Sequence, residues 1–466
     1  MNTSYYEFIK NKNKSVPNAG FDIKTDSLNK NLFKWQKDVV RWALNKGKCA
    51  LFLDTGLGKT FCQLEWAYQV CKKTGGNVLI FAPLAVSHQT KREGEKYGIE
   101  VNICRDMNNI KNGINIANYE IMDRFIISDF IGIVLDESSC IKHFGAKTAR
   151  YLIEQCYTTN YRLCCTATPA PNDFMELGMH SEFLGVMKRS EMLSTFFVHD
   201  GGETAKWRLK GHAESEFWKW VASWACVIKT PGDLGYSDDG YILPKLTITQ
   251  HIVESKIFVS GDQALLFCEH AKTLNDRRAA RRNSVIERVN KAAEIANGSN
   301  EQVILWCDLN YESEMLSKII NGAVEVRGSD TTDHKTDTII NFLNGSIKAI
   351  ISKSSIYGFG INLQNCHRII FVGMNDSFES YYQAVRRCYR FGQKYPVDVH
   401  IITSESEGAV KANIERKHKN AEKMIQEMVK HTKDILKSEI NQTVRIQETY
   451  IPVEKMKIPK WLEAAA

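Results

Sequence analysis

The sequence has 466 residues, of which 43% are hydrophobic and 25% charged, a balance typical of a globular protein with two or three domains that excludes a largely disordered chain. The 61 basic and 54 acidic residues leave a formal charge of +7, which only weakly indicates a polyanionic partner. The 13 cysteines contain no C-x-x-C pair, so we predict neither a zinc site nor a disulfide framework. Without a signal peptide or an apolar run long enough to span a bilayer, we expect a soluble cytoplasmic protein with no membrane contact.

The first predicted elements are a short buried strand at 49–53, a glycine loop and a helix that includes 61–70. Their sequence, "LFLDTGLGKT", nearly matches the phosphate-loop pattern G-x-x-x-x-G-K-T, although Leu53 replaces its first glycine. In that setting, loop amides would bind phosphate at a helix N-terminus, with Lys59 on the β- and γ-phosphates and Thr60 on Mg²⁺. The alternative from the loop alone is an ordinary glycine turn before a helix.

Two series of apolar strands alternate with helix-compatible stretches. The first series is at 77–83, 114–119, 131–137 and 161–168, and the second is at 302–307, 347–353, 367–373 and 397–403. Near-continuous apolar strands that alternate with helices indicate a parallel sheet covered on both faces. We therefore predict an α/β fold with two tandem lobes, each a mainly parallel sheet flanked by helices.

The segments around these lobes have a different composition. An aromatic-rich stretch at 189–254 is interpreted as a lobe extension plus linker, in which Trp218, Trp220 and Trp224 are more readily explained as core than as an exposed wedge. A following basic helix could present a solvated face or a nucleic-acid contact through Arg277, Arg278, Arg281 and Arg282. The helix at 407–440 is expected to dock on the second lobe. The predicted domains are 1–230 with a helical insertion, 231–440, and a tail at 441–466.

Two adjacent carboxylates end one of the first-series strands, in "VLDESSCIKHF". The carboxyl ends of parallel strands are where ligand sites assemble. There, Asp136 could hold Mg²⁺ and Glu137 could orient and deprotonate an attacking water, as phosphoryl transfer requires. An isolated pair of this kind would more often cap a surface helix, but its position some eighty residues after a phosphate loop favours catalysis.

The second series supplies two arginines in "YYQAVRRCYRFGQ". Arg387 and Arg390 are three residues apart and would share a face if this stretch is helical. Arginines can neutralise the charge that develops on a γ-phosphate during transfer. Because these two belong to a different lobe from Lys59, we expect an ATP site in the cleft that is completed when the lobes close. The alternative is a simple basic helix face.

At this point the sequence resembles a known family. The stretches "LFLDTGLGKT", "LDESSCIKH", "TATPAPNDFMELG", "SKSSIYGFGINLQ" and "QAVRRCYRFGQ" are similar, in order and spacing, to the motifs of superfamily 2 helicases, specifically Swi/Snf-type DNA translocases. The resemblance covers roughly residues 30 to 405 and implies two RecA-like lobes. The chain's small size is similar to translocases of bacteriophages and mobile elements, which would act in a bacterial or phage-infected cell.

The resemblance implies roles for individual residues. Gln36 would recognise adenine and Gln383 would line the nucleotide cleft, while the other ATP contacts would come from Thr55, Gly56, Leu57, Gly58, Lys59 and Thr60. Hydrolysis would be coupled to DNA contact by Thr166, Ala167, Thr168, Gly358, Gly360 and Asn362. The chain departs from the family pattern at Ser138 and Ser139, which end the acidic box, and at His88, where tryptophan is common.

The leading hypothesis is therefore a Mg²⁺-dependent, nucleic-acid-stimulated ATPase that moves on duplex or branched DNA with little sequence specificity. Its rivals are a strand-separating helicase, an RNA-remodelling ATPase, and a clamp that binds ATP without turnover. The clamp would predict loss of Lys59, Glu137 or Arg387, and all three are present. An RNA-remodelling enzyme fits the two lobes but not the segment "RFGQ".

Overall fold

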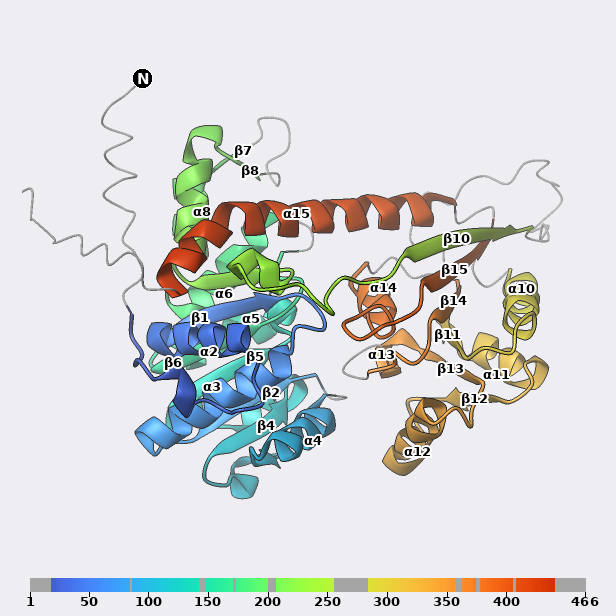
Figure 1. The fold of residues 1–466 in the computed structure, drawn as a ribbon, viewed down its shortest axis with the longest axis horizontal. Helices are drawn as coiled ribbons and strands as arrows, with labels where there is room; N and C mark the ends of the chain where they lie inside the picture. Colours follow the sequence, from blue (N-terminus) through green and yellow to red (C-terminus); the bar gives the residue numbers. More distant parts are fainter. Residues whose placement is uncertain are drawn as a thin grey trace, which may run out of the picture.

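The computed structural model describes residues 18–83, 86–141, 147–170, 173–199, 207–254, 284–357, 362–373, 378–404 and 408–440. Within them the chain forms two α/β lobes that lie side by side (Figure 1). This confirms the predicted fold class. Among the described residues, no helix combines the length and apolar character needed to cross a bilayer.

The first lobe is built on a parallel sheet in the order β3-β4-β2-β5-β6-β1-β9. Its strands are β1 Lys48–Leu53, β2 Val78–Ala82, β3 Val101–Ile103, β4 Ile114–Asn118, β5 Gly132–Asp136, β6 Tyr161–Cys165 and β9 Ala225–Ile228. Its helices are α2 Lys34–Lys46, α3 Lys59–Thr74, α4 Ser87–Tyr97, α5 Lys147–Gln155, α6 Leu177–Leu184, α7 Arg189–Phe196 and α8 Glu214–Ala222. A short antiparallel pair, β7 Phe197–His199 and β8 Trp207–Leu209, lies outside this sheet.

The second lobe is built on a parallel sheet in the order β10-β15-β14-β11-β13-β12. Its strands are β10 Leu246–Val253, β11 Val303–Cys307, β12 Ala323–Val326, β13 Ala349–Lys353, β14 Arg368–Val372 and β15 Val397–Ser404. Its helices are α10 Val285–Asn297, α11 Asn310–Ile319, α12 Thr332–Leu343, α13 Ser354–Tyr357 and α14 Phe378–Val385. The predicted strand series therefore matches, and β3, β9, β10 and β12 are additional strands of the two large sheets.

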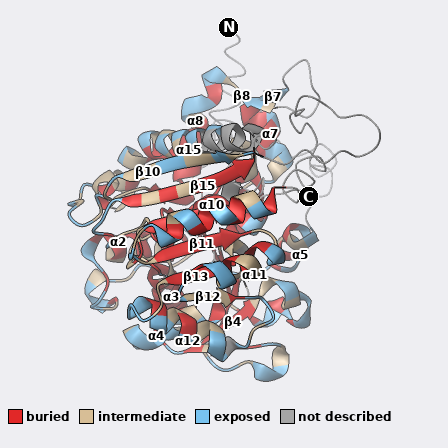
Figure 2. Ribbon diagram, turned by 90° about the vertical axis from the view of Figure 1, so that its right-hand side faces the viewer, coloured by how far each residue is buried: buried red, intermediate tan, exposed pale blue. Residues whose placement is uncertain are grey.

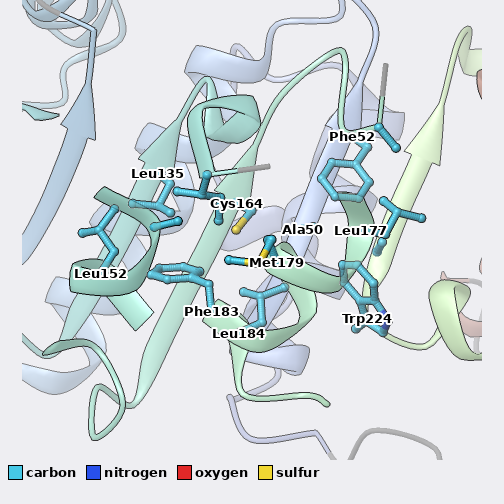
Figure 3. Packing of buried hydrophobic residues seen from close by; sticks show 14 of the residues in the cluster. Ala50, Phe52, Leu135, Leu152, Cys164, Leu177, Met179, Phe183, Leu184 and Trp224 are labelled. Carbon is cyan, nitrogen blue, oxygen red and sulfur yellow. The ribbon is translucent and has the colours of Figure 1, made fainter. Parts of the chain in front are cut away.

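The central strands of each sheet are buried on both faces, as their apolar sequences require, whereas the edge strand β10 is partly exposed. Along β1, Ala50 and Phe52 enter the hydrophobic cluster on one face, while Cys49, Leu51 and Leu53 enter the cluster on the other. Figure 3 shows the first of these clusters, where Phe52 lies near Trp224 and Leu135 near Leu152. Figure 2 shows the same pattern in the second lobe, where β11 and β13 are buried and α10 is partly exposed.

The long helix α15 (Gly408–Ile440) corrects one expectation. It was predicted to dock on the second lobe, but its C-terminal half crosses to the first (Figure 1), where it contacts α8, β9 and α2. Met428 and Val429 join one first-lobe cluster and Leu436 joins the other. The physical reason is that burying these apolar side chains in the first-lobe clusters removes them from water.

Polar contacts fix the same placement. Trp42 Nε1 donates a hydrogen bond to Glu439 at 2.8 Å, and Lys46 forms an ion pair with that carboxylate at 3.1 Å. The His431 ring stacks on Trp218, with ring centres 5.5 Å apart. The segment after β9 also stays on the first lobe, since Tyr236 and Tyr241 pack against its core. The predicted boundary at 230/231 lies between β9 and β10. The chain still packs on the first lobe at Tyr241 and enters the second sheet at β10.

Candidate ATP-hydrolysis site

The loop between β1 and α3 adopts the backbone that a phosphate site needs. Gly56 and Gly58 have φ values of 90° and 75°, in the left-handed region that favours glycine. Lys59 begins α3, and its Nζ donates a hydrogen bond to the carbonyl of Leu53 at 3.1 Å. Leu53, which replaces the first glycine of the usual phosphate-loop pattern, thus contributes its backbone carbonyl as a hydrogen-bond acceptor for Lys59. The N-terminus of a 16-residue helix therefore faces the loop, as anion binding requires.

Gln36, on α2, forms a hydrogen bond with this loop. Its Nε2 donates to the carbonyl of Leu57 at 2.9 Å, and its Oε1 accepts from the amide of Phe33 at 2.9 Å. A Cβ at Gly58 would lie 2.5 Å from Gln36 Nε2, so this close approach also requires glycine. Contact between Gln36 and adenine stays a prediction, while its contact with the loop is direct.

Asp136 is the last residue of β5, which lies two strands from β1 in the sheet, and Glu137 directly follows it. Burial, together with the neighbouring Glu137 charge, raises the pKa of Asp136 to about 7, and Lys59 opposes this rise. Glu137 has a φ of 51°, unusual for a residue other than glycine, and its Oε2 is buried without a hydrogen-bond partner. Two crowded, desolvated acids near a lysine form a site that a cation would stabilise.

The residues proposed to couple hydrolysis to DNA contact are only partly described. Thr166 and Thr168 are buried after β6, and Thr166 Oγ1 accepts from the Thr168 amide at 3.1 Å, with Ala167 buried between them. Asn362 is exposed, and its side chain accepts from the Gln364 amide at 3.3 Å. Gly358 and Gly360 lie outside the described residues, as do Arg277, Arg278, Arg281 and Arg282.

Arg387 reaches this site from the second lobe. Its Nη2 donates to Gln383 Oε1 at 3.2 Å, and both side chains are buried. Burial and the Arg390 charge lower the pKa of Arg387 to about 10, whereas Glu137 and Asp136 act to raise it. Arg387 therefore lies within electrostatic reach of both carboxylates of the other lobe.

The two predicted arginines do not share a helix face. Helix α14 ends at Val385, so Arg387 and Arg390 occupy the turns that follow it. Burial lowers the pKa of Arg390, and the acid that opposes this shift is Glu93 on α4. The charges of Glu137 and Asp136 thus act on Arg387, whereas that of Glu93, on a different helix of the first lobe, acts on Arg390.

Sequence reasoning missed the residues that join the lobes. Asp54, which directly follows β1, accepts a hydrogen bond from Tyr382 Oη at 3.0 Å and pairs with Arg386 at 3.5 Å. Phe391 packs against the phosphate loop so closely that a Cβ at Gly56 would lie 2.8 Å from its backbone nitrogen. Arg386 was visible beside Arg387 in the sequence, but no local signal showed which arginine would meet which acid.

Two other features that the sequence analysis singled out, the serine of the acidic box and the three tryptophans, are buried in the first lobe. Ser138, one of the departures in the acidic box, is buried, and its Oγ lies 3.2 Å from His180 Nε2 on α6. Trp218, Trp220 and Trp224 are 1%, 6% and 0% exposed. The three tryptophans are therefore core residues, as predicted, and none is available as a strand-separating wedge.

Comparisons with known proteins match both lobes. A family described as the SNF2-related domain matches residues 35–198, and one described as the helicase conserved C-terminal domain matches 284–392; together they cover more than half of the chain. A protein of Acanthamoeba polyphaga mimivirus named as a putative ATP-dependent RNA helicase is 31% identical over 99 residues, which are 20% of this chain and 18% of that protein. The chain thus matches less than a fifth of this relative's length. The solved SWI2/SNF2 ATPase core of Sulfolobus solfataricus in complex with dsDNA is 20% identical, with a TM-score of 0.41, over 91% of this chain and 99% of that one.

Proposed function

We propose that this chain, which belongs to the Swi/Snf-like branch of the superfamily 2 helicases and ATPases, uses ATP hydrolysis to move along duplex DNA. As a member it is an ATP-hydrolysing, helicase-like motor; the duplex track is our proposal. The observation that carries it is the packing of the second lobe on the phosphate loop, where Phe391 lies against Gly56, with Arg387 within electrostatic reach of Asp136 and Glu137. A site divided in this way links the chemical step to lobe closure.

ATP with Mg²⁺ fits the residues present. The glycine loop and the N-terminus of α3 offer amides to phosphate, and Lys59 offers a positive charge. The Thr60 hydroxyl and the Asp136 carboxylate are hard oxygen ligands of the kind that Mg²⁺ prefers, and the bound ion would supply charge neutralisation at the phosphates. The unpartnered Oε2 of Glu137 would accept a proton from the attacking water, and Arg387 would stabilise negative charge on the transferred group.

Duplex DNA is favoured over the other tracks for two reasons. The segment "RFGQ" resembles the Swi/Snf branch, and Phe391 within it contacts the phosphate loop, so the feature that resembles this branch also touches the ATP site. A strand-separating helicase needs a wedge, and the tryptophans that might have served are buried in the first-lobe core. RNA remodelling remains an outcome of the test below.

The test is the ATPase rate measured side by side without nucleic acid and with single-stranded DNA, duplex DNA, forked DNA and RNA. We expect duplex to stimulate at least as strongly as single strands, with Lys59→Ala as the inactive control. Stimulation by RNA alone would replace the proposed track with RNA. Equal rates under all conditions would reject a nucleic-acid motor.

A further inference from the structure

Asp54 is the residue at which the phosphate loop meets the second lobe. Its Oδ1 accepts from the Thr55 amide at 2.6 Å and from Tyr382 Oη at 3.0 Å, and its Oδ2 lies 3.5 Å from Arg386 Nη2. The first contact belongs to the phosphate loop, and the other two come from α14 and the turn after it. One carboxylate therefore contacts the element that binds phosphate and the element that delivers Arg387.

The second-lobe side of this contact is held in place by its own neighbours. The Arg386 guanidinium carbon lies 5.0 Å from the centre of the Tyr382 ring and 5.5 Å from that of Tyr389. Such cation–π contacts orient the guanidinium. Only 11% of the Arg386 side chain and 8% of the Asp54 side chain are exposed, so the pair is shielded from solvent and salt.

A shielded pair of this kind adds little net stability, because the cost of desolvating two charges offsets most of their attraction. Its better-supported role is to select one register among alternatives, since a register that separates the pair leaves a charge buried alone. The next residue, Arg387, is buried at the same contact, donates a hydrogen bond to Gln383, and lies within electrostatic reach of Asp136 and Glu137. Because Arg386 and Arg387 are adjacent in the chain, a contact that fixes the position of Arg386 also fixes that of Arg387.

We infer that Asp54 and Arg386, with Tyr382, form a positioning contact that aligns the second lobe on the phosphate loop and so places Arg387 for catalysis. Neither residue touches the reacting atoms in this role. The inference rests on the proposed ATP hydrolysis for its effect on rate, but the alignment itself is a property of the protein without nucleotide.

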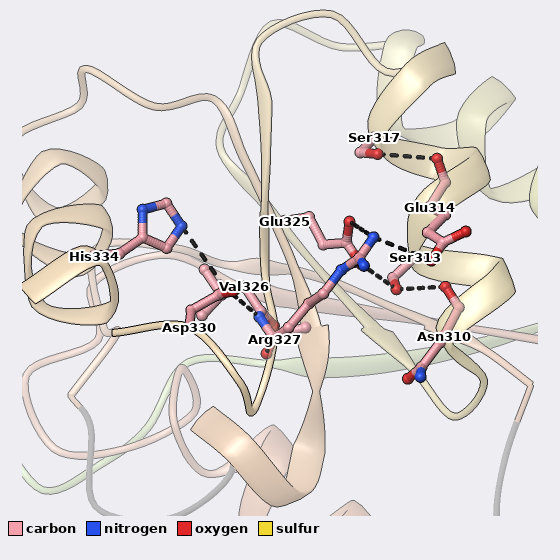
Figure 4. Close-up of polar contacts among 10 residues, drawn as sticks. Asn310, Ser313, Glu314, Ser317, Glu325, Val326, Arg327, Asp330 and His334 are labelled. Atoms are coloured by element: carbon pink, nitrogen blue, oxygen red, sulfur yellow. Dashed lines mark hydrogen bonds and ion pairs between the residues drawn. The ribbon is translucent and has the colours of Figure 1, made fainter. Parts of the chain in front are cut away.

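Two measurements test it. The first is the distance between fluorophores at Tyr157 and Tyr311, exposed residues on different lobes, attached through a genetically encoded reactive residue because Cys140 is exposed. Without nucleotide, Arg386→Gln should lengthen or broaden this distance. The matched control is Arg327→Gln, since Arg327 pairs with Glu325 and Glu314 inside the second lobe (Figure 4) and should leave the distance unchanged.

The second measurement is a double-mutant cycle on ATP turnover. Asp54→Asn and Arg386→Gln should each lower kcat by about tenfold, within the range for residues in contact, and the double variant should lose no more than either one. Arg386→Lys, which keeps the charge, should recover part of the loss. KM should change less than kcat, because alignment of Arg387 matters most in the transition state.

Losses that multiply in the double variant, or an inter-lobe distance unaffected by Arg386→Gln, would overturn the inference. Each single variant leaves one charge buried alone and should lower the thermal midpoint, whereas the double variant removes both charges and should recover part of it. Recovery of kcat together with the midpoint in the double variant would also overturn the inference, since the pair would then only hold the fold. If the wild-type chain hydrolyses no ATP, the proposed function fails, while the fluorescence measurement still decides the alignment.

Discussion

At the residue scale, Lys59 and Glu137 have different proposed roles. Lys59 binds the phosphates of ATP, whereas Glu137 acts only in hydrolysis. Lys59→Ala should abolish hydrolysis, because the positive charge on the phosphates is lost in both ground and transition states. Glu137→Gln should bind ATP and leave it uncleaved, because only the proton acceptor is removed. Nucleotide affinity by fluorescence titration and turnover by phosphate release check both. A glutamine variant that binds ATP no better than the alanine variant would contradict the role given to Glu137.

Arg387 and Arg390 can be distinguished by the acids they face. Arg387→Ala should lower kcat by about a thousandfold or more, because this side chain lies within electrostatic reach of Asp136 and Glu137 and can stabilise charge on the transferred phosphate. Arg390→Ala should have a smaller effect, since Glu93 on α4 is the acid that opposes its pKa shift. Steady-state kinetics provide the measurement, with Arg327→Ala as a second-lobe control. A large drop in thermal stability for Arg387→Ala would make the kinetic defect indirect.

At the element scale, α15 is a second connection between the lobes, besides the chain that joins them. Leu436 is fully buried against the first lobe, so Leu436→Ala should destabilise that contact by about 2–5 kcal/mol. Hydrogen exchange should then quicken in α8 and β9 more than in the second sheet. Asp434→Ala, at an exposed position of the same helix, is the control. Faster exchange confined to the second lobe would mean that α15 docks elsewhere in solution.

The elements that the sequence predicted share a local cause. Strands such as β5 and β11 are uninterrupted apolar runs with turn residues on both sides, and the loop before Lys59 carries its glycines at the positions with positive φ. Each of these signals lies within a few residues, so it survives without knowledge of the fold. The loop and strand that carry the proposed first-lobe ATP-site residues could therefore be predicted from the sequence, while the roles of those residues stay predictions.

The elements that were missed depend on distant partners. β9 lies in an aromatic-rich stretch and becomes a strand by pairing with β1, which precedes it by well over a hundred residues. α15 has an apolar stripe that fits either lobe, so its pattern alone does not select one. Asp54 and Arg386 are 332 residues apart, and their pairing follows only from the placement of the lobes.

At the scale of the whole molecule, two lobes that contact a nucleic-acid backbone should bind with little base preference and with an affinity that falls steeply as salt rises. If closure advances one lobe while the other holds, a third strand bound to the duplex should be displaced in an ATP-dependent manner without duplex opening. Triplex displacement assays check this, with Glu137→Gln as the control. Efficient unwinding of a tailed duplex, with no triplex displacement, would instead indicate a strand-separating helicase.

The left-handed backbone of Glu137 has an evolutionary consequence. Glu137→Gly and Glu137→Ala both remove the crowded carboxylate, but only glycine also relieves the φ of 51°, so the glycine variant should be more stable than the alanine variant by about 1 kcal/mol. Comparing their denaturation midpoints checks this, and equal midpoints would mean that the conformation costs nothing. In a library of variants selected for thermal stability alone, glycine would then be enriched at this position. The selected proteins would be more stable but would no longer hydrolyse ATP. Selection for activity must hold glutamate there against that enrichment.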